Sequence, residues 1–197
     1  MKIAIIKYNA GNTQSVIFAL ERMGIKPILT DDWEELKSAD KVIFPGVGEA
    51  STTMKHLKSL KLDQLIKALK QPVLGICLGM QLMCQHSEEG DTDCLGLFDV
   101  NVYRFQREYK KDKIPHMGWN NLTYLKGNWI ARGFRDTNMY FVHSYYVPVC
   151  KYTAAECQYI LPFSAALQKD NFYAVQFHPE KSGPQGEKLL ANFIERT

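Results

Sequence analysis

A cysteine at the end of an apolar run is the first residue of this sequence that could do covalent chemistry. Cys77 follows the run 73–76, and Gly75 and Gly79 lie two residues to either side of it, in G-I-C-L-G. A nucleophilic serine has the same spacing in the strand-turn-helix motif G-x-S-x-G, which lifts its side chain above a sheet. A helix beginning here would point its N-terminus at the sulfur and favour thiolate. A buried structural cysteine is the alternative, and the spacing favours the nucleophile.

A histidine and a glutamate near the C-terminus could serve such a thiol. His178 and Glu180 flank Pro179 in the segment F-H-P-E. Side chains two apart share a face of extended backbone, so the carboxylate could accept from Nδ1 and leave Nε2 as a base. A turn with a surface ion pair is one alternative. A zinc site is another, but the nucleotide-deaminase signature that contains H-x-E also needs P-C-x-x-C, which is missing.

Two further stretches have unusual composition. Residues 45–48, P-G-V-G, lack the Lys-Ser/Thr of a Walker motif and the spacing of GxGxxG. They could line the cysteine site, because neighbouring parallel strands end on the same edge of a sheet, or form an ordinary glycine-rich turn. Residues 115–120, P-H-M-G-W-N, could be core or a surface for a partner, where Trp and Met are enriched. The residue types alone do not distinguish a core segment from a partner surface.

The first 90 residues alternate between strand and helix patterns, and these elements must position the cysteine. We expect strands at 2–8, 27–29, 41–44 and 72–76, and helices at 14–23, 32–38, 51–70 and after residue 77. Leu60 and Lys61 interrupt the apolar stripe of the third helix, which favours two helical pieces. Asp32 with Glu35 three residues later resembles a capping box. Such alternation predicts a parallel sheet covered on both faces.

The second half reads differently, as short strands between turns. Strands are expected at 98–105, 119–122, 139–147, 163–167 and 172–177, with a closing helix at 185–195 and a charged loop at 106–113. We therefore predict an α/β fold of three layers in one domain, 1–197. Its central sheet would be mostly parallel, with antiparallel additions and a last strand that returns to the sheet.

Composition narrows the class of protein. The 197 residues are 46% hydrophobic and 23% charged, with a formal net charge of +3, which is too mild to indicate nucleic acid or membrane partners. No stretch is long enough for a signal peptide or a membrane span. Five cysteines without a C-x-x-C pair argue against a disulfide framework or a zinc knuckle. A cytoplasmic location is expected.

The motifs in this order resemble those of the class I (triad) glutamine amidotransferases. These are G-I-C-L-G-M-Q, then H-P-E about a hundred residues later, with P-G-V-G before both. The resemblance implies the flavodoxin-like fold of that family, with Cys77 as nucleophile, His178 as base and Glu180 as the residue that orients it. Backbone amides of Val47 and Leu78 would form the oxyanion hole. Residues matching the glutamine-binding positions are Gly48, Gln81, Glu89, Ser144 and Tyr145. No cofactor or metal is implied.

P-H-M-G-W-N and Y-N-A-G-N narrow the resemblance to the glutaminase subunits of imidazole glycerol phosphate synthase, in histidine biosynthesis. It implies hydrolysis of L-glutamine through a cysteinyl thioester and transfer of ammonia to a (β/α)8-barrel cyclase subunit, HisF, in a heterodimer. The cyclase would make imidazole glycerol phosphate and AICAR. Residues expected at the interface are Gly11, Asn12, Met117, Trp119 and Asn120.

One loop departs from the family pattern. Where the family has D-Y-G-x-G-N, this chain has Lys7 and Asn9 in K-Y-N-A-G-N. This difference concerns docking of the partner and leaves the expected catalytic triad unaffected. Two alternatives stay open. One is a glutaminase of another synthase, resembling that of anthranilate synthase or a surface-sugar paralogue. The other is a non-catalytic α/β binding module.

Overall fold

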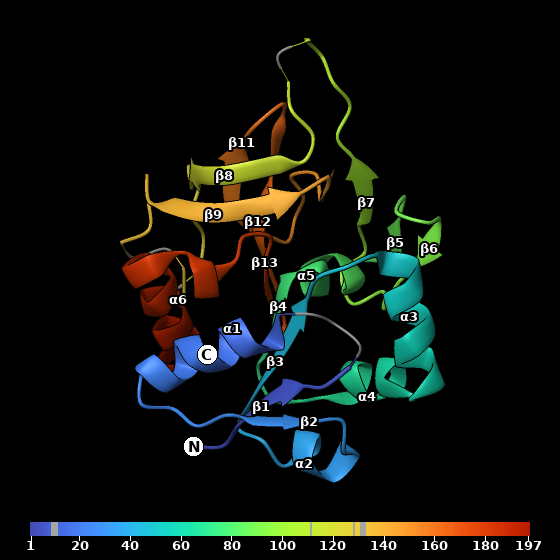
Figure 1. Ribbon diagram of the computed structural model, residues 1–197, viewed down its shortest axis with the longest axis vertical. Helices are drawn as coiled ribbons and strands as arrows, with labels where there is room; N and C mark the ends of the chain where they lie inside the picture. Colours follow the sequence, from blue (N-terminus) through green and yellow to red (C-terminus); the bar gives the residue numbers. More distant parts are fainter. Residues whose placement is uncertain (9–11, 111, 128, 131–132) are drawn as a thin grey trace.

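A seven-stranded sheet forms the centre of the computed structural model, which describes residues 1–8, 12–110, 112–127, 129–130 and 133–197 (Figure 1). The strand order is β11-β12-β13-β4-β3-β1-β2. In chain order the strands are β1 (Ile3–Ile6), β2 (Ile28–Thr30), β3 (Lys41–Gly46), β4 (Val73–Cys77), β11 (Thr153–Gln158), β12 (Pro162–Lys169) and β13 (Phe172–Val175).

The five strands from β13 to β2 are parallel, whereas β12 and β11 add to one edge in antiparallel fashion. The expected mostly parallel α/β sheet with antiparallel additions is therefore confirmed. The last strand, β13, returns beside β4 as predicted. Strand β11 was not predicted. Its sequence, T-A-A-E-C-Q, has a single β-branched residue, so it carries little strand signal.

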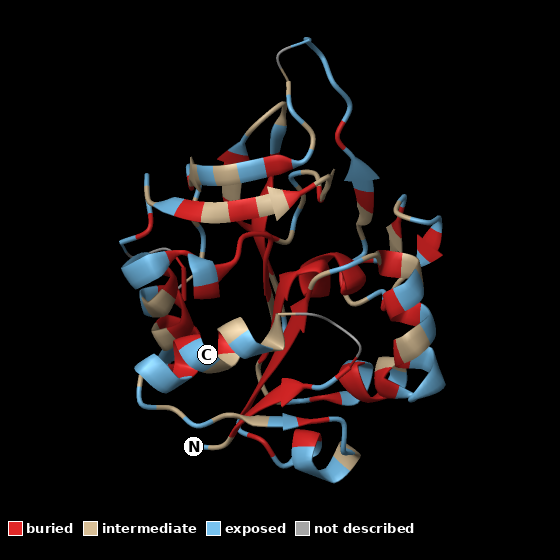
Figure 2. Ribbon diagram, in the orientation of Figure 1, coloured by how far each residue is buried: buried red, intermediate tan, exposed pale blue. Residues whose placement is uncertain are grey.

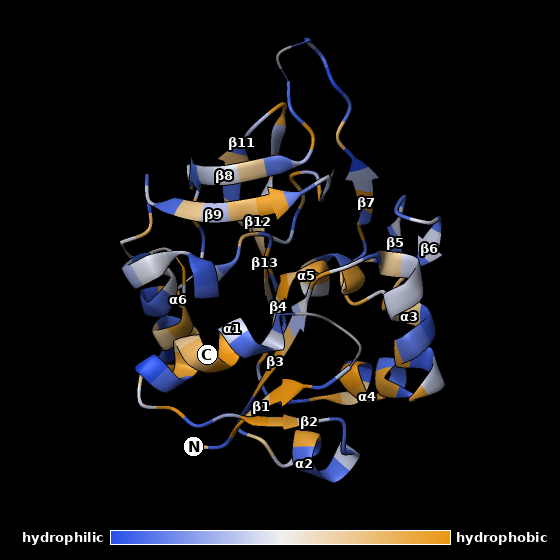
Figure 3. Ribbon diagram, viewed as in Figure 1, coloured by the Kyte–Doolittle hydropathy of each residue, from blue (hydrophilic) through white to orange (hydrophobic). Residues whose placement is uncertain are grey.

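Helices cover both faces of the sheet and complete the three layers. On one face lie α1 (Thr13–Arg22) and α6 (Gly183–Arg196), and on the other α2 (Trp33–Lys37), α3 (Ala50–Ser59), α4 (Leu62–Ala68) and α5 (Leu78–Leu82). Strand side chains alternate between the two cores: Ile3 and Ile5 pack with the first pair of helices, Ala4 and Ile6 with the second group. The central strands are accordingly buried (Figure 2) and apolar (Figure 3).

Local signals for the helices were largely correct. The Asp32 carboxylate accepts a hydrogen bond from the Glu35 amide at 2.9 Å, which starts α2 as the sequence predicts. The long helical segment breaks between α3 and α4, where Lys61 has a φ of 56°. Within the described residues, no helix is both long and apolar enough to cross a membrane.

Two small sheets, formed mostly by the second half of the chain, lie beyond the carboxyl ends of the parallel strands (Figure 1). One is an antiparallel pair, β8 (His116–Asn121) with β9 (Asn138–His143). The other has the order β10-β7-β5-β6, formed by β10 (Tyr145–Tyr146), β7 (Asn101–Arg104), β5 (His86–Ser87) and β6 (Thr92–Asp93). The expected strand 139–147 is thus two strands, and the two-residue strands β5 and β6 were not predicted.

Candidate active site

Cys77 occupies the junction between β4 and α5, the sharp turn that the sequence predicts. Its backbone has φ 53° and ψ −107°, a region that a residue with a side chain rarely adopts. Holding such a conformation costs on the order of 1–3 kcal/mol, which the surrounding packing must supply. The turn carries the side chain out of the sheet and leaves Cys77 7% exposed.

The flanking glycines serve close packing rather than the turn angle, since the positive φ belongs to the cysteine itself. A Cβ atom on Gly79 would lie 2.1 Å from the Phe44 carbonyl oxygen, and one on Gly46 would lie 2.6 Å from the Gly79 amide nitrogen. On Gly75 it would lie 2.8 Å from the sulfur of Met83. The three glycines therefore let β3, β4 and α5 approach each other directly beside the thiol.

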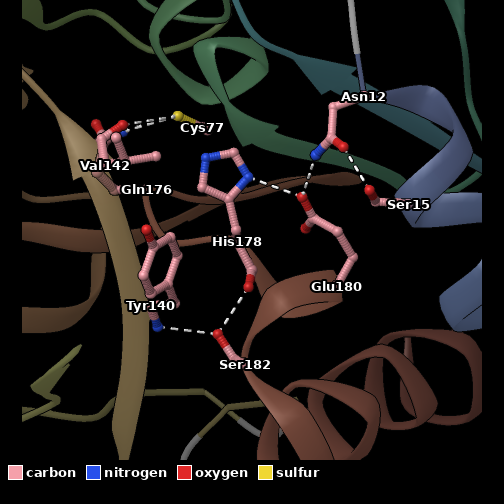
Figure 4. A network of polar contacts seen from close by, with 9 residues as sticks. All are labelled: Asn12, Ser15, Cys77, Tyr140, Val142, Gln176, His178, Glu180 and Ser182. Carbon is pink, nitrogen blue, oxygen red and sulfur yellow. Dashed lines mark hydrogen bonds and ion pairs between the residues drawn. The ribbon is translucent and has the colours of Figure 1, made fainter. Parts of the chain in front are cut away.

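His178 and Glu180 form a buried pair next to this cysteine. Nδ1 of His178 lies 2.8 Å from Oε1 of Glu180, and each side chain is 1% exposed. Nε2 of His178 points toward Cys77 and has no hydrogen-bond partner among the described residues (Figure 4). The expected pairing is present, although Pro179–Lys181 form a short 3-10 helix, η1, instead of continuing the extended backbone.

The surroundings of His178 favour its charged form. Burial alone would lower its pKa, but the Cys77 sulfur and the Glu180 carboxylate together raise the pKa of His178 to about 10. An imidazolium between a carboxylate and a sulfur in turn stabilises thiolate on the sulfur.

Asn12 contacts the same carboxylate oxygen as His178. Its amide nitrogen donates to Oε1 of Glu180 at 3.0 Å, and its oxygen accepts from the hydroxyl of Ser15 (Figure 4). Asn12 precedes α1 in the left-handed conformation, with a φ of 74°. The loop that was expected to face a partner thus also contacts the carboxylate beside His178.

A cavity of about 320 Å³ opens over the thiol, and every residue predicted to bind glutamine or stabilise an oxyanion lines it. Its walls are Val47, Gly48, Cys77, Leu78, Gln81, Glu89, Pro115, Val142, His143, Ser144, Tyr145 and His178. Leu78 is the first residue of α5, so its amide has no carbonyl partner within the helix. Glu89 is half-buried and accepts from the amide of Ala50 at 2.9 Å.

Comparison with known proteins decides the family. Residues 4–197 match the family described as glutamine amidotransferase class-I. The imidazole glycerol phosphate synthase subunit HisH of Bacteroides fragilis (strain YCH46) is 63% identical over 196 residues, covering 99% of this chain and 100% of that protein. The chain belongs to the class I glutamine amidotransferases, in their HisH group. The HisH subunit of Yersinia pseudotuberculosis serotype I is 45% identical over 197 residues, 99% of this chain and 100% of that one.

Solved structures agree on the fold of this amidotransferase. A glutamine amidotransferase superposes with a TM-score of 0.74 at 18% identity, covering 99% of this chain and 98% of that one. The structure of PurLQS from Thermotoga maritima gives 0.70 at 16%, covering 98% and 97%. At these identities the likeness concerns the fold alone.

The segment P-G-V-G of the amidotransferase leads from β3 to the cavity. Gly46 still pairs with Cys77 across β3 and β4, and Gly48 has a φ of 116°. The hydroxyl of Tyr8 donates to the Pro45 carbonyl. Burial, with the Cys77 sulfur nearby, raises the pKa of Tyr8 above its ordinary value, so it remains a donor. Sequence reasoning missed this tyrosine, which lay within an expected strand.

Two more polar residues, one beside the thiol and one behind His178, escaped the sequence analysis. Gln176 is fully buried, and its amide nitrogen lies 3.7 Å from Cys77 Sγ. The Ser182 hydroxyl donates to the His178 carbonyl at 2.7 Å and accepts from the Tyr140 amide at 3.0 Å (Figure 4). The only sequence signal for Gln176 and Ser182 was their closeness to H-P-E, because neither residue type forms a recognisable catalytic pair with a neighbour.

Strand β8 resolves the alternatives for P-H-M-G-W-N. Met117 and Trp119 are exposed, at 63% and 59%, whereas His116 is buried at 3%. Asn120 is half-buried, and its amide nitrogen donates to the Gln158 carbonyl at 2.9 Å. The segment therefore contributes to both core and surface. Gly11, also expected at the interface, and Asn9 of the departing loop lie outside the described residues.

Proposed function

We propose that this chain is the glutaminase subunit of an imidazole glycerol phosphate synthase and acts in histidine biosynthesis. The observation that carries the proposal is the Cys77 thiol, placed beside the buried His178–Glu180 pair and open to a cavity. The HisH names of relatives that are 63% and 45% identical support the assignment to this synthase. The proposal treats 1–197 as one glutaminase domain that works in the cytoplasm.

The proposed reaction begins with Cys77 thiolate, which attacks the side-chain amide carbon of glutamine. The amides of Val47 and Leu78 would donate to the resulting oxyanion, and each such donor is worth about 3 kcal/mol in a transition state. His178 gives its proton to the departing ammonia, leaving a glutamyl thioester. His178 then accepts a proton from water, whose oxygen attacks the thioester carbonyl, releasing glutamate and regenerating Cys77.

The cavity walls suit an amino-acid substrate. Among the lining residues that the structure describes, Glu89 is the one acidic side chain, and it would face the α-ammonium of glutamine. Burial raises the pKa of Glu89, and the bond from the Ala50 amide opposes this shift. Gly48, Ser144 and Tyr145 lie around the same space and would contact the rest of the substrate.

The proposed partner is a (β/α)8-barrel cyclase, HisF, in a heterodimer. Ammonia would pass to it and be built into imidazole glycerol phosphate with release of AICAR, without a cofactor on this chain. Exposed Met117 and Trp119 would lie in the contact, since large apolar side chains of this kind are enriched at interfaces.

The proposal is tested with the purified chain, a barrel cyclase and the cyclase substrate. We expect glutamate release that rises when the cyclase is added, and labelling of Cys77 by diazo-norleucine. Failure to label or to hydrolyse glutamine under both conditions would favour a binding module. Hydrolysis that responds to an anthranilate synthase partner, and not to the cyclase, would favour a different synthase.

A further inference from the structure

Two buried histidines face each other across β8 and β9, and the proposed reaction uses neither. Nδ1 of His116 lies 3.0 Å from Nε2 of His143, and the residues are 3% and 6% exposed. The His116 ring stacks on Phe141 and on Tyr159, with centroids 4.9 and 4.0 Å apart. Such packing fixes the rings, so the positions of their protons follow from their hydrogen bonds.

The neighbouring groups determine those protons. Nδ1 of His143 lies 2.7 Å from the Tyr145 carbonyl, which can only accept, so Nδ1 carries hydrogen. Nε2 of neutral His143 must then accept from Nδ1–H of His116. The remaining nitrogen of His116 accepts from the amide nitrogen of Asn120 at 3.3 Å. Asn120 cannot be flipped without loss, because its oxygen accepts from the Asn121 amide and its nitrogen donates to a carbonyl.

The same Tyr145 carbonyl continues the chain of bonds toward the thiol. It also accepts from Nε2 of Gln81 at 3.0 Å, and the second hydrogen of that nitrogen goes to Oε1 of Gln176 at 2.9 Å. Gln176 is thereby oriented with its oxygen toward Gln81. Its Nε2 must face Cys77 Sγ, which lies 3.7 Å away (Figure 4).

We propose that His116 and His143 are positioning residues for Cys77, which hold the Tyr145 carbonyl so that Gln81 and Gln176 present an N–H group to the sulfur. The inference deepens the proposed function and rests on it for the role of Cys77. An N–H stabilises thiolate, whereas a flipped Gln176 would present its oxygen and repel the negative sulfur. As a thiol, Cys77 instead donates to the Val142 carbonyl at 3.8 Å.

The pair must be neutral to serve in this way. A proton added to His143 would leave two N–H groups facing each other or force His116 to point a hydrogen at the Asn120 amide. Burial lowers the pKa of His116 to about 4 and that of His143 to about 3, in agreement with the bonding pattern. The orientation of Gln176 is therefore constant at neutral pH.

The experiment measures Cys77 itself. The rate of carboxymethylation of the Cys77 peptide by iodoacetamide is followed by mass spectrometry at several pH values, alongside kcat and KM for glutamine. In His143→Leu, the link to the Tyr145 carbonyl is lost, and we expect alkylation at pH 7 and kcat to fall about tenfold. His143→Asn places an amide N–H near the position of Nδ1 and should restore both to within about threefold. His56→Leu on α3 serves as the matched control.

Gln176→Leu removes the final donor and should reproduce the loss in His143→Leu. Gln176→Glu keeps an acceptor for Gln81 but places an oxygen near the sulfur, so alkylation should fall further. The double variant His143→Leu/Gln176→Leu should be no worse than Gln176→Leu alone, because both changes remove the same N–H.

The inference is overturned if folded His143→Leu alkylates within twofold of the unmodified chain, if the Leu and Asn variants are alike, or if the double variant shows additive losses. Should His143→Leu not fold, equal rates in Gln176→Leu and the unmodified chain would overturn it instead. Alkylation needs no glutamine turnover. A chain that shows this pattern without hydrolysing glutamine would therefore refute the proposed function and leave the inference standing.

Discussion

The thiol of Cys77 is held out of the sheet by a backbone conformation that tight packing must maintain. Three glycines remove the side chains that would separate β3, β4 and α5 at this point. The helix start and the buried His178 then act on the same sulfur. Geometry and electrostatics at the residue scale therefore both depend on the strained turn.

Replacing the sulfur tests its proposed role directly. Cys77→Ser and Cys77→Ala should abolish glutamine hydrolysis, measured as glutamate release, while circular dichroism and thermal unfolding remain near those of the unmodified chain. Ser or Ala at any of the other four cysteines, Cys84, Cys94, Cys150 and Cys157, should leave the rate comparable. More than about a hundredth of the rate in Cys77→Ala would indicate another nucleophile.

The two members of the buried pair should differ in importance. His178→Asn removes the base, and such a loss costs at least about 10²-fold in rate. Glu180→Gln should cost less, because its amide oxygen can still accept from His178 Nδ1 and from Asn12. Steady-state rates of the purified, folded variants decide the order. A larger loss in Glu180→Gln would reverse the proposed roles.

Gly79 provides a test of the close packing. Gly79→Ala would place Cβ 2.1 Å from a backbone oxygen that cannot rotate away, so we expect destabilisation of more than about 3 kcal/mol. Gly24→Ala is the control for a glycine that has backbone strain without close packing. Gly24 has a positive φ, 79°, unlike Gly79, but it has open space around it, and the substitution should cost only about 1 kcal/mol. Urea unfolding of both variants gives the comparison, and similar losses would mean that packing at Gly79 is unimportant.

At the scale of elements, β8 and β9 contribute to the interior and the surface at once. Alternation along β8 buries His116 against aromatic rings and exposes Met117 and Trp119. The cost of burying polar imidazoles is offset by their mutual hydrogen bond and by the bond from His143 to the Tyr145 carbonyl.

Burial of His116 and His143 should make the folded chain less stable in mild acid. Their folded pKa values, about 4 and 3, lie below the ordinary 6.5, so their contribution is complete above pH 6.5 and is lost as pH falls. The free energy of unfolding should drop by about 1.4 kcal/mol per pH unit for each. His178, whose pKa is raised, affects the pH dependence of the free energy of unfolding only above pH 6.5. Glu49, with a pKa of about 2, affects it only below pH 4.5. Burial raises the pKa of Glu89, so protonation of this carboxyl in acid increases the free energy of unfolding and opposes the effect of the histidines.

Urea unfolding at pH 6.5 and pH 5 measures this slope. His143→Asn removes one of the two protons taken up on unfolding and should flatten the dependence. An unchanged slope in His143→Asn would show that the pair does not stay neutral in the folded chain.

Elements with a strong local pattern could be predicted, and those set by tertiary pairing could not. Hydrophobic residues recur with a clear strand or helix pattern in β1, β3 and β4 and in α1 and α3. Strand β11 is alanine-rich and is a strand because β12 pairs with it. At the candidate site, Cys77, His178 and Glu180 were predicted from residue type and spacing, and the structure places them together. Gln176 and Tyr8 were not, since each acts through a contact with a residue far away in sequence.

Taken as a whole, the molecule places its cavity between the sheet edge and the β8–β9 pair. The cavity is lined from both sides, by Val47 and Gly48 after β3 and by Val142 at the end of β9. Tyr8 holds the Pro45 carbonyl, and Val47 and Gly48 follow it at the cavity wall, where we propose that the Val47 amide changes orientation. A partner that contacts β8 would thus lie near both halves of the site.

The rate of glutamine hydrolysis should depend on that partner. A hundredfold activation of the glutaminase requires about 2.7 kcal/mol of differential binding between two orientations of the Val47 amide, which one peptide reorientation can supply. Trp119→Ala removes a large exposed side chain from β8 and should weaken both cyclase binding and stimulation of glutamine hydrolysis. Tyr124→Ala, an exposed aromatic outside β8, should change neither. Titration of cyclase, with free ammonia as the control for cyclase chemistry, separates binding from turnover. An isolated chain that already hydrolyses glutamine at the rate of the complex would contradict this account, as would Trp119→Ala and Tyr124→Ala variants that behave alike.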